Sequence, residues 1–361
     1  MDQDLSYWVA FNVFPGIGPQ RFKILLDYFK TAKKAYEATD ESWREIGLNE
    51  NLVNSFLNFR KKFNPQEFLA QVKTKKISIV TIKDKSYPQL LKQISDAPPI
   101  LYIKGVIEPQ DSLAIGIVGT RKISSYGREV TEILVRDLVA NGLTIVSGLA
   151  RGVDSLAHKT AIDCGGRTIA VLGCGVDMVY PPENKYLYEE IIKHGAVISE
   201  VPPGQYVAKG IFPARNRIIS GLSLGVVVTE GAEDSGSLIS ARDAANQGRE
   251  VFAVPGPITS YLSAAPAILI KNGAKLVYNV NDILDELDIK SNKQKIESRK
   301  VIPDNPDEEK ILKILTNEQV HIDNLVRISG METGKITSLL ALMEIKGKVK
   351  NLGGMVYTVA R

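Results

Sequence analysis

The chain has 361 residues, which is too long for one ordinary hydrophobic core, so we expect two or three domains. Its composition, 44% hydrophobic and 24% charged, is that of a folded globular protein and excludes the collagen-like and low-complexity classes. The net charge is only +4, so an anionic partner must be met by a local cluster of basic side chains.

The first residues, MDQDLSYWVA, carry acids where a signal peptide needs bases, and no apolar run approaches the ~20 residues of a membrane span. We therefore expect a cytoplasmic protein that makes no membrane contact. The two cysteines, Cys164 and Cys174, lack CxxC spacing, and the three histidines lie far apart in sequence. This pattern predicts no disulfide frame, no metal site and no cofactor.

Residues 1–75 show a helical pattern, in which apolar residues such as Phe22, Leu25 and Phe29 recur three and four positions apart. Between the first two helices, Phe14-Pro-Gly-Ile-Gly-Pro19 has glycines two apart, which suit a tight turn because glycine reaches positive φ. Such a turn either binds a nucleic-acid phosphate or simply joins two helices. We predict an N-terminal helical domain of the SAM or helix-hairpin-helix type over residues 1–75.

The period of the pattern changes between residues 77 and 286. Short β-branched runs, several of them continuously apolar, alternate with helical segments, as expected for strands buried on both faces. We expect strands at 77–82, 113–118, 143–147, 168–172, 196–200, 224–229 and 251–254, and helices at 127–140, 153–163, 185–193 and 236–247. This alternation predicts an α/β fold with a doubly wound, mostly parallel sheet, whose ligand lies beyond the carboxyl ends of the strands.

Residues 287–307 have few apolar residues, many charges and two prolines, which indicates a linker. Three helical patterns follow, at 308–316, 321–329 and 333–346, and then two short strands around a Gly-Gly turn. We predict a winged-helix-like domain over residues 308–361. Its third helix has few bases and a wide apolar face, which favours packing or a protein partner over duplex DNA.

Two loops that follow predicted strands combine small residues with bases. The first, Gly119-Thr-Arg-Lys-Ile-Ser-Ser-Tyr-Gly127, offers Arg121 and Lys122, and Ser124 or Ser125 is expected to cap the next helix so that its N–H groups face an anion. The alternative is a capped turn with solvated bases. Phosphate contact is favoured because the same chemistry recurs in neighbouring loops.

The second loop, Ser147-Gly-Leu-Ala-Arg-Gly-Val-Asp154, repeats this design, with Ser147 and Gly148 as candidate contacts and Asp154 as the expected helix cap. His158 has no sequence-adjacent nucleophile, so we expect it to be structural. A further loop, Asp234-Ser-Gly-Ser237, opens another helix and adds a candidate anion nest at Ser235, Gly236 and Ser237.

A third loop, Leu172-Gly-Cys-Gly-Val-Asp177, begins like a dinucleotide fingerprint, and Glu200 ends the next strand where a ribose-binding acid can sit. The pattern fails at Met178, where the third glycine is required, and two prolines delay the helix. The chain also lacks GxxxxGK[ST]. The sequence therefore excludes a P-loop motor and gives little support to a dinucleotide site.

The segment from Pro202 to Arg217 suits a strand of nucleic acid. Its cations neutralise phosphates and its aromatic side chains, Phe212 and Tyr206, offer flat faces for bases; the cations are Lys209, Arg215 and Arg217. A short helix is expected over 214–222. Because the two arginines lie two positions apart, a helix does not aim both of them and Asn216 in one direction, so at least one of the three is structural.

The spacing shows no Ser-His-Asp arrangement and no clustered carboxylates on adjacent loops. Four acids stand near strand ends and fit either an acidic pair or loop capping: Glu200, Glu230, Glu233 and Asp234. The signal favours anion binding over bond breaking.

An ordered set of motifs resembles the DNA-processing protein A family, called DprA or Smf, over most of residues 80–280. These motifs are GTRKISSYG, SGLARGVDSLAHKTAI, AVLGCGVDMVYPPEN, ISEVPPG, FPARNRIISGLS, SGSLISA and GREVFAVPG. The resemblance implies an extended Rossmann-like domain that binds single-stranded DNA, protects incoming DNA, forms a homodimer and loads the recombinase RecA during natural transformation. It implies no catalytic turnover.

On the family pattern, Arg121 matches the arginine of a G-S-R loop that begins at Gly119, and Lys209, Phe212 and Arg215 match the single-strand groove. Asn216 and Arg217 complete an R-N-R signature. One departure is visible, because the family's Ser-x-Gly-x-Asn pattern is replaced by Ser263-Ala-Ala-Pro-Ala267, which puts an anion contact there in doubt.

Three functions are open at this stage. The first is a single-stranded DNA-binding module that is not an enzyme. The second is a nucleotide-processing hydrolase on a Rossmann-like fold, with Glu200 or Glu230 as base. The third is an interaction protein whose basic loops contact an acidic partner surface.

Overall fold

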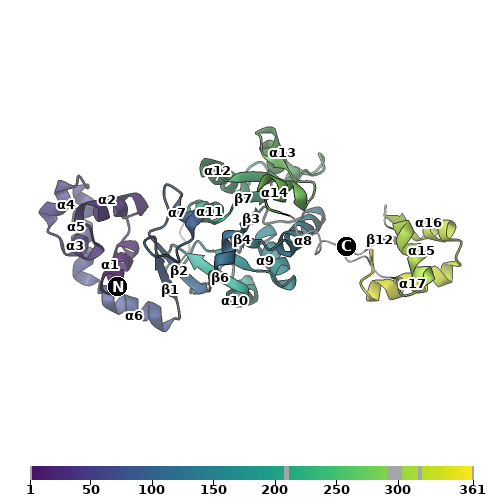
Figure 1. The fold of residues 1–361 in the computed structure, drawn as a ribbon, viewed down its shortest axis with the longest axis horizontal. Coiled ribbons are helices and arrows are strands. Elements are labelled where there is room, and N and C mark those ends of the chain that lie inside the picture. Colours follow the sequence, from purple (N-terminus) through teal and green to yellow (C-terminus); the bar gives the residue numbers. More distant parts are fainter. Residues whose placement is uncertain (1, 207–210, 291–302, 316–318, 360–361) are drawn as a thin grey trace. The chain divides into compact units, whose positions relative to one another are not determined.

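A computed structural model describes residues 2–206, 211–290, 303–315 and 319–359 (Figure 1). The chain divides into two compact units, with the boundary between residues 291 and 292. The first unit contains both the predicted helical segment and the predicted sheet. The finer division of that unit near residue 76, and the predicted extent of the linker, stay predictions.

The first unit begins with six helices: α1 (Asp2–Val13), α2 (Pro19–Phe29), α3 (Ala32–Glu37), α4 (Asp40–Glu45), α5 (Glu50–Lys62) and α6 (Pro65–Thr74). Aromatic side chains fill their core. The rings of Phe11 and Phe56 stack with centroids 5.2 Å apart, and Trp43 stacks on Phe56 at 4.1 Å. In the turn before α2, only Gly16 adopts positive φ (106°), whereas Gly18 is the N-cap of α2 with φ −82°.

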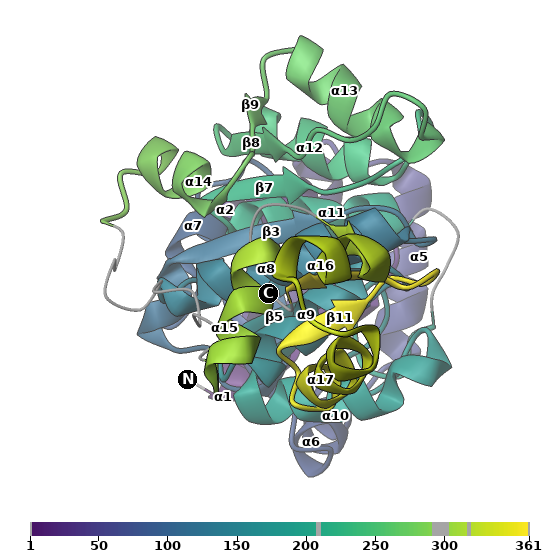
Figure 2. The ribbon, with the colours of Figure 1, turned by 90° about the vertical axis from the view of Figure 1, so that its right-hand side faces the viewer.

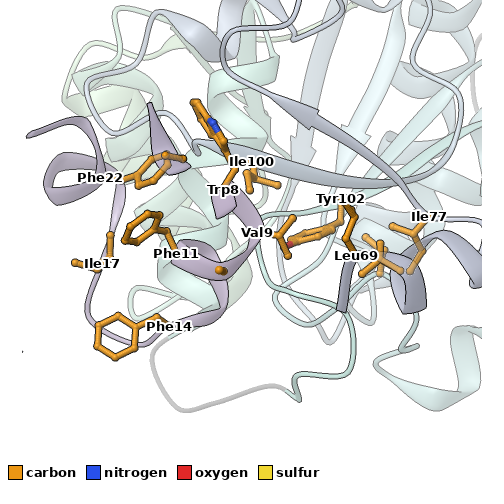
Figure 3. Close-up of a cluster of buried hydrophobic side chains, with 14 of the residues drawn as sticks. Trp8, Val9, Phe11, Phe14, Ile17, Phe22, Leu69, Ile77, Ile100 and Tyr102 are labelled. Atoms are coloured by element: carbon orange, nitrogen blue, oxygen red, sulfur yellow. The ribbon is translucent and has the colours of Figure 1, made fainter. Parts of the chain in front are cut away.

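These helices share a hydrophobic core with the sheet. Figure 3 shows side chains of α1 in one cluster with Ile100 and Tyr102 of strand β2 (Ile100–Gly105). Polar contacts reinforce the junction, because the Tyr102 hydroxyl donates to Asn12 Oδ1 at 2.8 Å and Asn12 Nδ2 donates to the carbonyl of Glu200 at 3.1 Å. Helix α1 is therefore attached to the sheet at two neighbouring strands.

The sheet has nine strands in the order β1-β2-β6-β5-β4-β3-β7-β8-β9. The strands are β1 (Ser78–Thr81), β2, β3 (Ala114–Val118), β4 (Thr144–Ser147), β5 (Thr168–Val171), β6 (Gly195–Ser199), β7 (Gly225–Val228), β8 (Glu250–Ala253) and β9 (Lys275–Leu276). Strands β3 to β9 pair in parallel, whereas β1–β2 and β2–β6 are antiparallel. Figure 2 shows β9, β8, β7 and β3 in succession from one edge. The predicted mostly parallel sheet is confirmed.

Helices cover both faces of the sheet. On β5, Ile169 and Val171 join a cluster with Ile218 and Ile219 of α11 (Ile211–Leu222), whereas the alternate residue Ala170 joins Tyr188 and Ile191 of α10 (Lys185–His194). Because successive side chains of a strand point to opposite faces, α10 and α11 lie on opposite sides. The other helices of this unit are α7 (Gln89–Lys92), α8 (Ser125–Ala140), α9 (Val153–Asp163), α12 (Ser237–Asn246), α13 (Ala264–Lys271) and α14 (Val280–Glu286).

The second unit is a winged helix. It contains α15 (Pro306–Leu315), α16 (Ile322–Ser329) and α17 (Thr333–Ile345), and a three-stranded sheet in the order β10 (Val320–His321), β12 (Val356–Val359), β11 (Val349–Asn351). Its core includes Ile311, Leu325, Ile336, Leu340 and Met343. The sequence predicts two strands here, and the structure adds β10, which is only two residues long.

Candidate nucleic-acid interface

The order of the strands reverses between β3 and β7. After β3 the chain adds β4, β5 and β6 on one side, whereas β7 and β8 lie on the other side of β3. Two loops leave the sheet at this point, residues 119–124 after β3 and residues 229–236 after β7. In open α/β sheets, ligands bind in the crevice beyond the carboxyl ends of the strands at such a switch point.

Glu230, two residues beyond β7, holds the first of these loops in place. The residue is 4% exposed, and its carboxylate accepts hydrogen bonds from the backbone N–H of Ser124 at 3.0 Å and from the Ser124 hydroxyl at 2.5 Å. Its carbonyl oxygen accepts from the N–H of Thr120 at 2.8 Å. Ser124 Oγ also accepts from the N–H of Gly127 at 3.0 Å, which confirms Ser124 as the cap of α8. The carboxylate of Glu230 is thus used for loop structure.

Arg121 and Lys122 lie in this clamped loop, and both are exposed. Gly119 lies below them, where an added Cβ would come within 2.6 Å of Val153 Cγ2 and 2.9 Å of the Glu230 carbonyl oxygen. The glycine is therefore needed for close packing of the loop on its neighbours. Packing alone therefore explains the glycine, and the close approach of Gly119 to a ligand stays a prediction.

Arg215, predicted to contact phosphate, is 6% exposed and points into the protein. Its Nη1 donates to the carbonyl oxygen of Gly148 at 2.6 Å and to that of Val171, and its Nε donates to Asn216 Oδ1 at 3.2 Å. Burial lowers the pKa of this guanidinium, and the charge of Asp154 opposes that shift. A direct phosphate contact by Arg215 does not fit this arrangement, because its guanidinium already binds the loop after β4 and the end of β5.

Hydrogen bonds within the protein hold the loop after β4 in place. Ser147 is fully buried and donates to the carbonyl oxygen of Ile117 at 2.6 Å. An added Cβ on Gly148 would lie 2.1 Å from Arg215 Nη1, so a larger residue here would displace the Arg215 guanidinium. Asp154 Oδ2 accepts from the N–H of Gly148 at 3.1 Å. The expectation that Ser147 and Gly148 contact a ligand is corrected, because both are buried and shape the loop.

The role expected for Asp154 is corrected as well. The N-cap of α9 is Gly152, whereas Asp154 lies inside the first turn and bonds backward to the loop. Burial raises the pKa of its carboxyl, and the neighbouring Arg215 opposes that change. His158 is fully buried with Nδ1 2.7 Å from Thr168 Oγ1, and burial lowers its pKa to about 3. A structural His158, as predicted, agrees with this position.

Arg217 and Asn216 also make contacts within the protein. Arg217 Nη2 donates to Glu200 Oε2 at 2.5 Å, and its Nε lies 3.2 Å from Asp96 Oδ2. Only 13% of the Arg217 side chain is exposed. Burial raises the pKa of Glu200, and Arg217 counteracts the shift. The sequence predicts that at least one of Arg215, Asn216 and Arg217 is structural, and in the structure both arginines bind acceptors of the chain.

The loop after β7 ends at the start of α12. The hydroxyls of Ser235 and Ser237 lie 2.8 Å apart, and the exposed Gly236 has no atom within 4 Å of an added Cβ. This end of the crevice is open, with small residues and backbone on its surface. A role of these three residues in anion binding stays a prediction.

Two predicted contacts lie partly or wholly outside the described residues. Lys209 falls in the segment 207–210, and nothing is described of the Phe212 side chain, although its backbone lies in the first turn of α11. Tyr206, at the edge of that segment, is 80% exposed. Within the described ranges, no three His, Cys, Asp or Glu side chains are grouped to hold a metal ion. No described helix is long and apolar enough to cross a membrane.

Two family models match the chain. The model for DNA recombination-mediator protein A matches residues 78–288, and that for the DprA winged helix domain matches residues 297–355. The chain belongs to the DNA recombination-mediator protein A family, DprA/Smf. The resemblance found in the ordered motifs is therefore confirmed, and the DprA winged helix coincides with the second unit of the structure.

The DprA/Smf relatives match over long stretches. Protein Smf of Synechocystis sp. is 32% identical over 99% of both chains. The structure of DNA processing protein A from Streptococcus pneumoniae aligns with a TM-score of 0.70 at 36% identity, over 78% of this chain and 97% of that one. A structure that addresses the single-stranded DNA binding mode of DNA processing protein A from Helicobacter pylori aligns with a TM-score of 0.53 at 31% identity, over 59% and 95%.

Proposed function

We propose that this protein binds single-stranded DNA across the carboxyl edge of its sheet, at the switch point between β3 and β7. The observation that carries the proposal is the loop with Arg121 and Lys122, which is exposed at its basic side chains and clamped from behind by Glu230. A fixed loop presents its charges without an ordering cost at the moment of binding. The Helicobacter relative, whose structure concerns single-stranded DNA binding, supports the same ligand.

The residues of this interface have two kinds of role. Arg121 and Lys122 neutralise phosphates, and Lys209 and Phe212, on the family pattern, add a further charge and a stacking face. Arg215 acts indirectly, because it holds the loop after β4, and this loop leads to Val153, whose N–H donates to the carbonyl oxygen of Thr120 next to Arg121. Gly119, Ser147 and Gly148 shape the loops at this edge, and the loop at Ser235, Gly236 and Ser237 offers the N–H of Gly236 to a phosphate, since the N–H groups of Ser235 and Ser237 already donate within the loop.

The proposal extends to DNA processing in natural transformation. A protein of this family that holds incoming single strands protects them and loads RecA onto them, as a homodimer in the cytoplasm and without catalytic turnover. The support is the family membership and the length of the match to protein Smf. The RecA step is tested by whether this protein accelerates RecA filament assembly on DNA that is already covered by a single-strand-binding protein.

The hydrolase alternative finds no support at the two acids that the sequence offers for it. Glu230 accepts two hydrogen bonds from Ser124, and Glu200 is paired with Arg217. A general base must reach its substrate, whereas Glu230 is buried and Glu200 is held in its ion pair. Release of free base from nucleoside monophosphates by the purified protein would reopen this alternative.

Fluorescence anisotropy with labelled oligothymidylate and a matched duplex tests the proposed ligand. We expect tighter binding of the single strand, and an affinity for it that falls with salt because phosphate contacts release counterions. Equal affinity for both forms, or no binding of the single strand at low salt, would contradict the proposed function.

A further inference from the structure

A groove of about 770 Å³ lies along the exposed face of α9, where that helix packs between α8 and α10. We call it the α9 groove. It opens at Arg121 and Lys122, in the clamped loop, and its lining extends to Asp163 at the end of α9. A helix of this length spans about 16 Å, so the groove is a path leading away from the carboxyl edge. Its volume lies within the roughly 300–1,000 Å³ of ligand clefts.

The unpaired charges of the α9 groove are mostly positive. Of its acids, Glu183 is paired with Arg151, and Glu190 with Lys193 at 2.7 Å. In contrast, the side chains of Lys122, Arg128 and Lys159 form no ion pair with any residue that the structure describes, and all three are exposed. Asp163 is the exposed acid that remains. The groove therefore attracts an anion along its length.

The α9 groove also has an apolar floor and one prominent aromatic side chain. Leu156 and Ile162 of α9 and Leu187 of α10 line it. Tyr186, at the start of α10, is 74% exposed beside them. A ring in this position has a free face, and aromatic side chains next to basic ones are the combination that holds bases and phosphates of a single strand.

We propose that the α9 groove binds a second stretch of the same DNA strand that the carboxyl edge holds, with phosphates on Arg128 and Lys159 and a base on Tyr186. This inference rests on the function proposed above. The continuity of the groove with the loop of Arg121 and Lys122 favours a continuing strand over a separate mononucleotide, because both surfaces share these two residues. The strand thus leaves the sheet edge between α8 and α10.

The test measures, by fluorescence anisotropy, how tightly the whole 361-residue chain binds oligothymidylates of about 6 and about 20 nucleotides. A double variant, Arg128→Ala with Lys159→Ala, is expected to bind the long oligomer about tenfold more weakly. Its salt slope should fall by about 1.4, which is two contacts at roughly 0.7 each. Binding of the short oligomer should stay unchanged. Tyr186→Ala should weaken only the long oligomer, at least fivefold, whereas Tyr186→Phe keeps the ring and the affinity.

The charge-matched control is Lys271→Ala with Lys290→Ala, two exposed lysines of the same unit outside the groove, which should bind both oligomers as the unaltered protein does. If the groove variant binds the long oligomer normally, or loses affinity for both lengths equally, the α9 groove is not an extension of the path. Lys159-dependent binding of thymidine monophosphate with normal binding of the long oligomer would make it a nucleotide site instead. If the unaltered protein binds neither length, the proposed function fails together with this inference.

Discussion

Arg215 and Gly148 are joined by a hydrogen bond of 2.6 Å between the arginine Nη1 and the glycine carbonyl oxygen. The same nitrogen reaches the carbonyl oxygen of Val171, so one buried guanidinium connects α11 to the loop after β4 and to the end of β5. Asp154 Oδ2 accepts a hydrogen bond from the N–H of the same Gly148. The part of the crevice next to Arg121 and Lys122 is thus built on a buried polar network.

Replacement of Arg215 should show whether this side chain supports the folded structure or contacts a phosphate of the DNA. We expect Arg215→Ala to lower the free energy of unfolding by roughly 2–4 kcal/mol, because two carbonyl groups lose their donor and the buried Asp154 loses a neighbouring charge. Affinity for single-stranded DNA should fall, whereas the salt slope of binding should stay the same. Urea unfolding and anisotropy at several salt concentrations measure both. A slope reduced by about 0.7 would instead mark Arg215 as a phosphate contact.

The contact between Glu230 and the loop of residues 119–124 can be weakened by substitution of Ser124. Its hydroxyl caps α8 and donates to Glu230, so Ser124→Ala should cost about 1–2 kcal/mol of stability and weaken DNA binding. The neighbouring Ser125 is exposed, and Ser125→Ala is the matched control. Thermal unfolding and anisotropy on both variants check the prediction. Equal effects of the two substitutions would show that the clamp has no special role.

His158 should make the protein less stable in mild acid. Its pKa is about 3 in the folded protein and near 6.5 when unfolded, so the unfolded state binds more protons between these values. The stability contributed by the neutral ring is complete above pH 6.5 and is lost as the pH falls toward 3. Between pH 7 and pH 5 the loss should be about 2 kcal/mol.

The matched variant for this effect is His158→Gln, which keeps a hydrogen-bonding side chain near Thr168 but does not titrate. Urea unfolding at pH 7 and pH 5 gives the difference between the two proteins. We expect the variant to lose about 2 kcal/mol less than the unaltered protein over this range. The same loss in both would show that His158 is not buried as a neutral ring.

The fold could be predicted well where burial controls the pattern. The seven strands predicted for the large sheet each appear in the structure. Several are continuous apolar runs, because a strand covered on both faces has few polar positions, whereas β1 lies at the sheet edge and has the exposed Ser78. Strand β2 was not predicted, since it follows Pro98 and Pro99 and its last residues, Lys104 and Gly105, are not apolar. Strand β9 is only two residues long and exposed, so its sequence carries no pattern.

The sequence could predict which loops form the candidate site, but not the direction in which a side chain such as that of Arg215 points. Glycine and basic residues after a strand indicate an anion site, and this placed Arg121 and Lys122 at the carboxyl edge. The inward direction of Arg215 depends on carbonyl groups 67 and 44 residues away in sequence, which no local pattern contains. The α9 groove could not be predicted for the same reason, because its residues Arg128, Lys159 and Tyr186 come from three different helices.

The measurement that tests the central claim most directly is the salt dependence of single-stranded DNA binding for the unaltered protein and for Arg121→Ala with Lys122→Ala. Both side chains are exposed, so the variant should fold normally, as its thermal unfolding will show. We predict weaker binding and a salt slope reduced by about 1.4, for two lost contacts at roughly 0.7 each. An unchanged affinity and slope in a folded variant would contradict the claim that the strand lies across this loop.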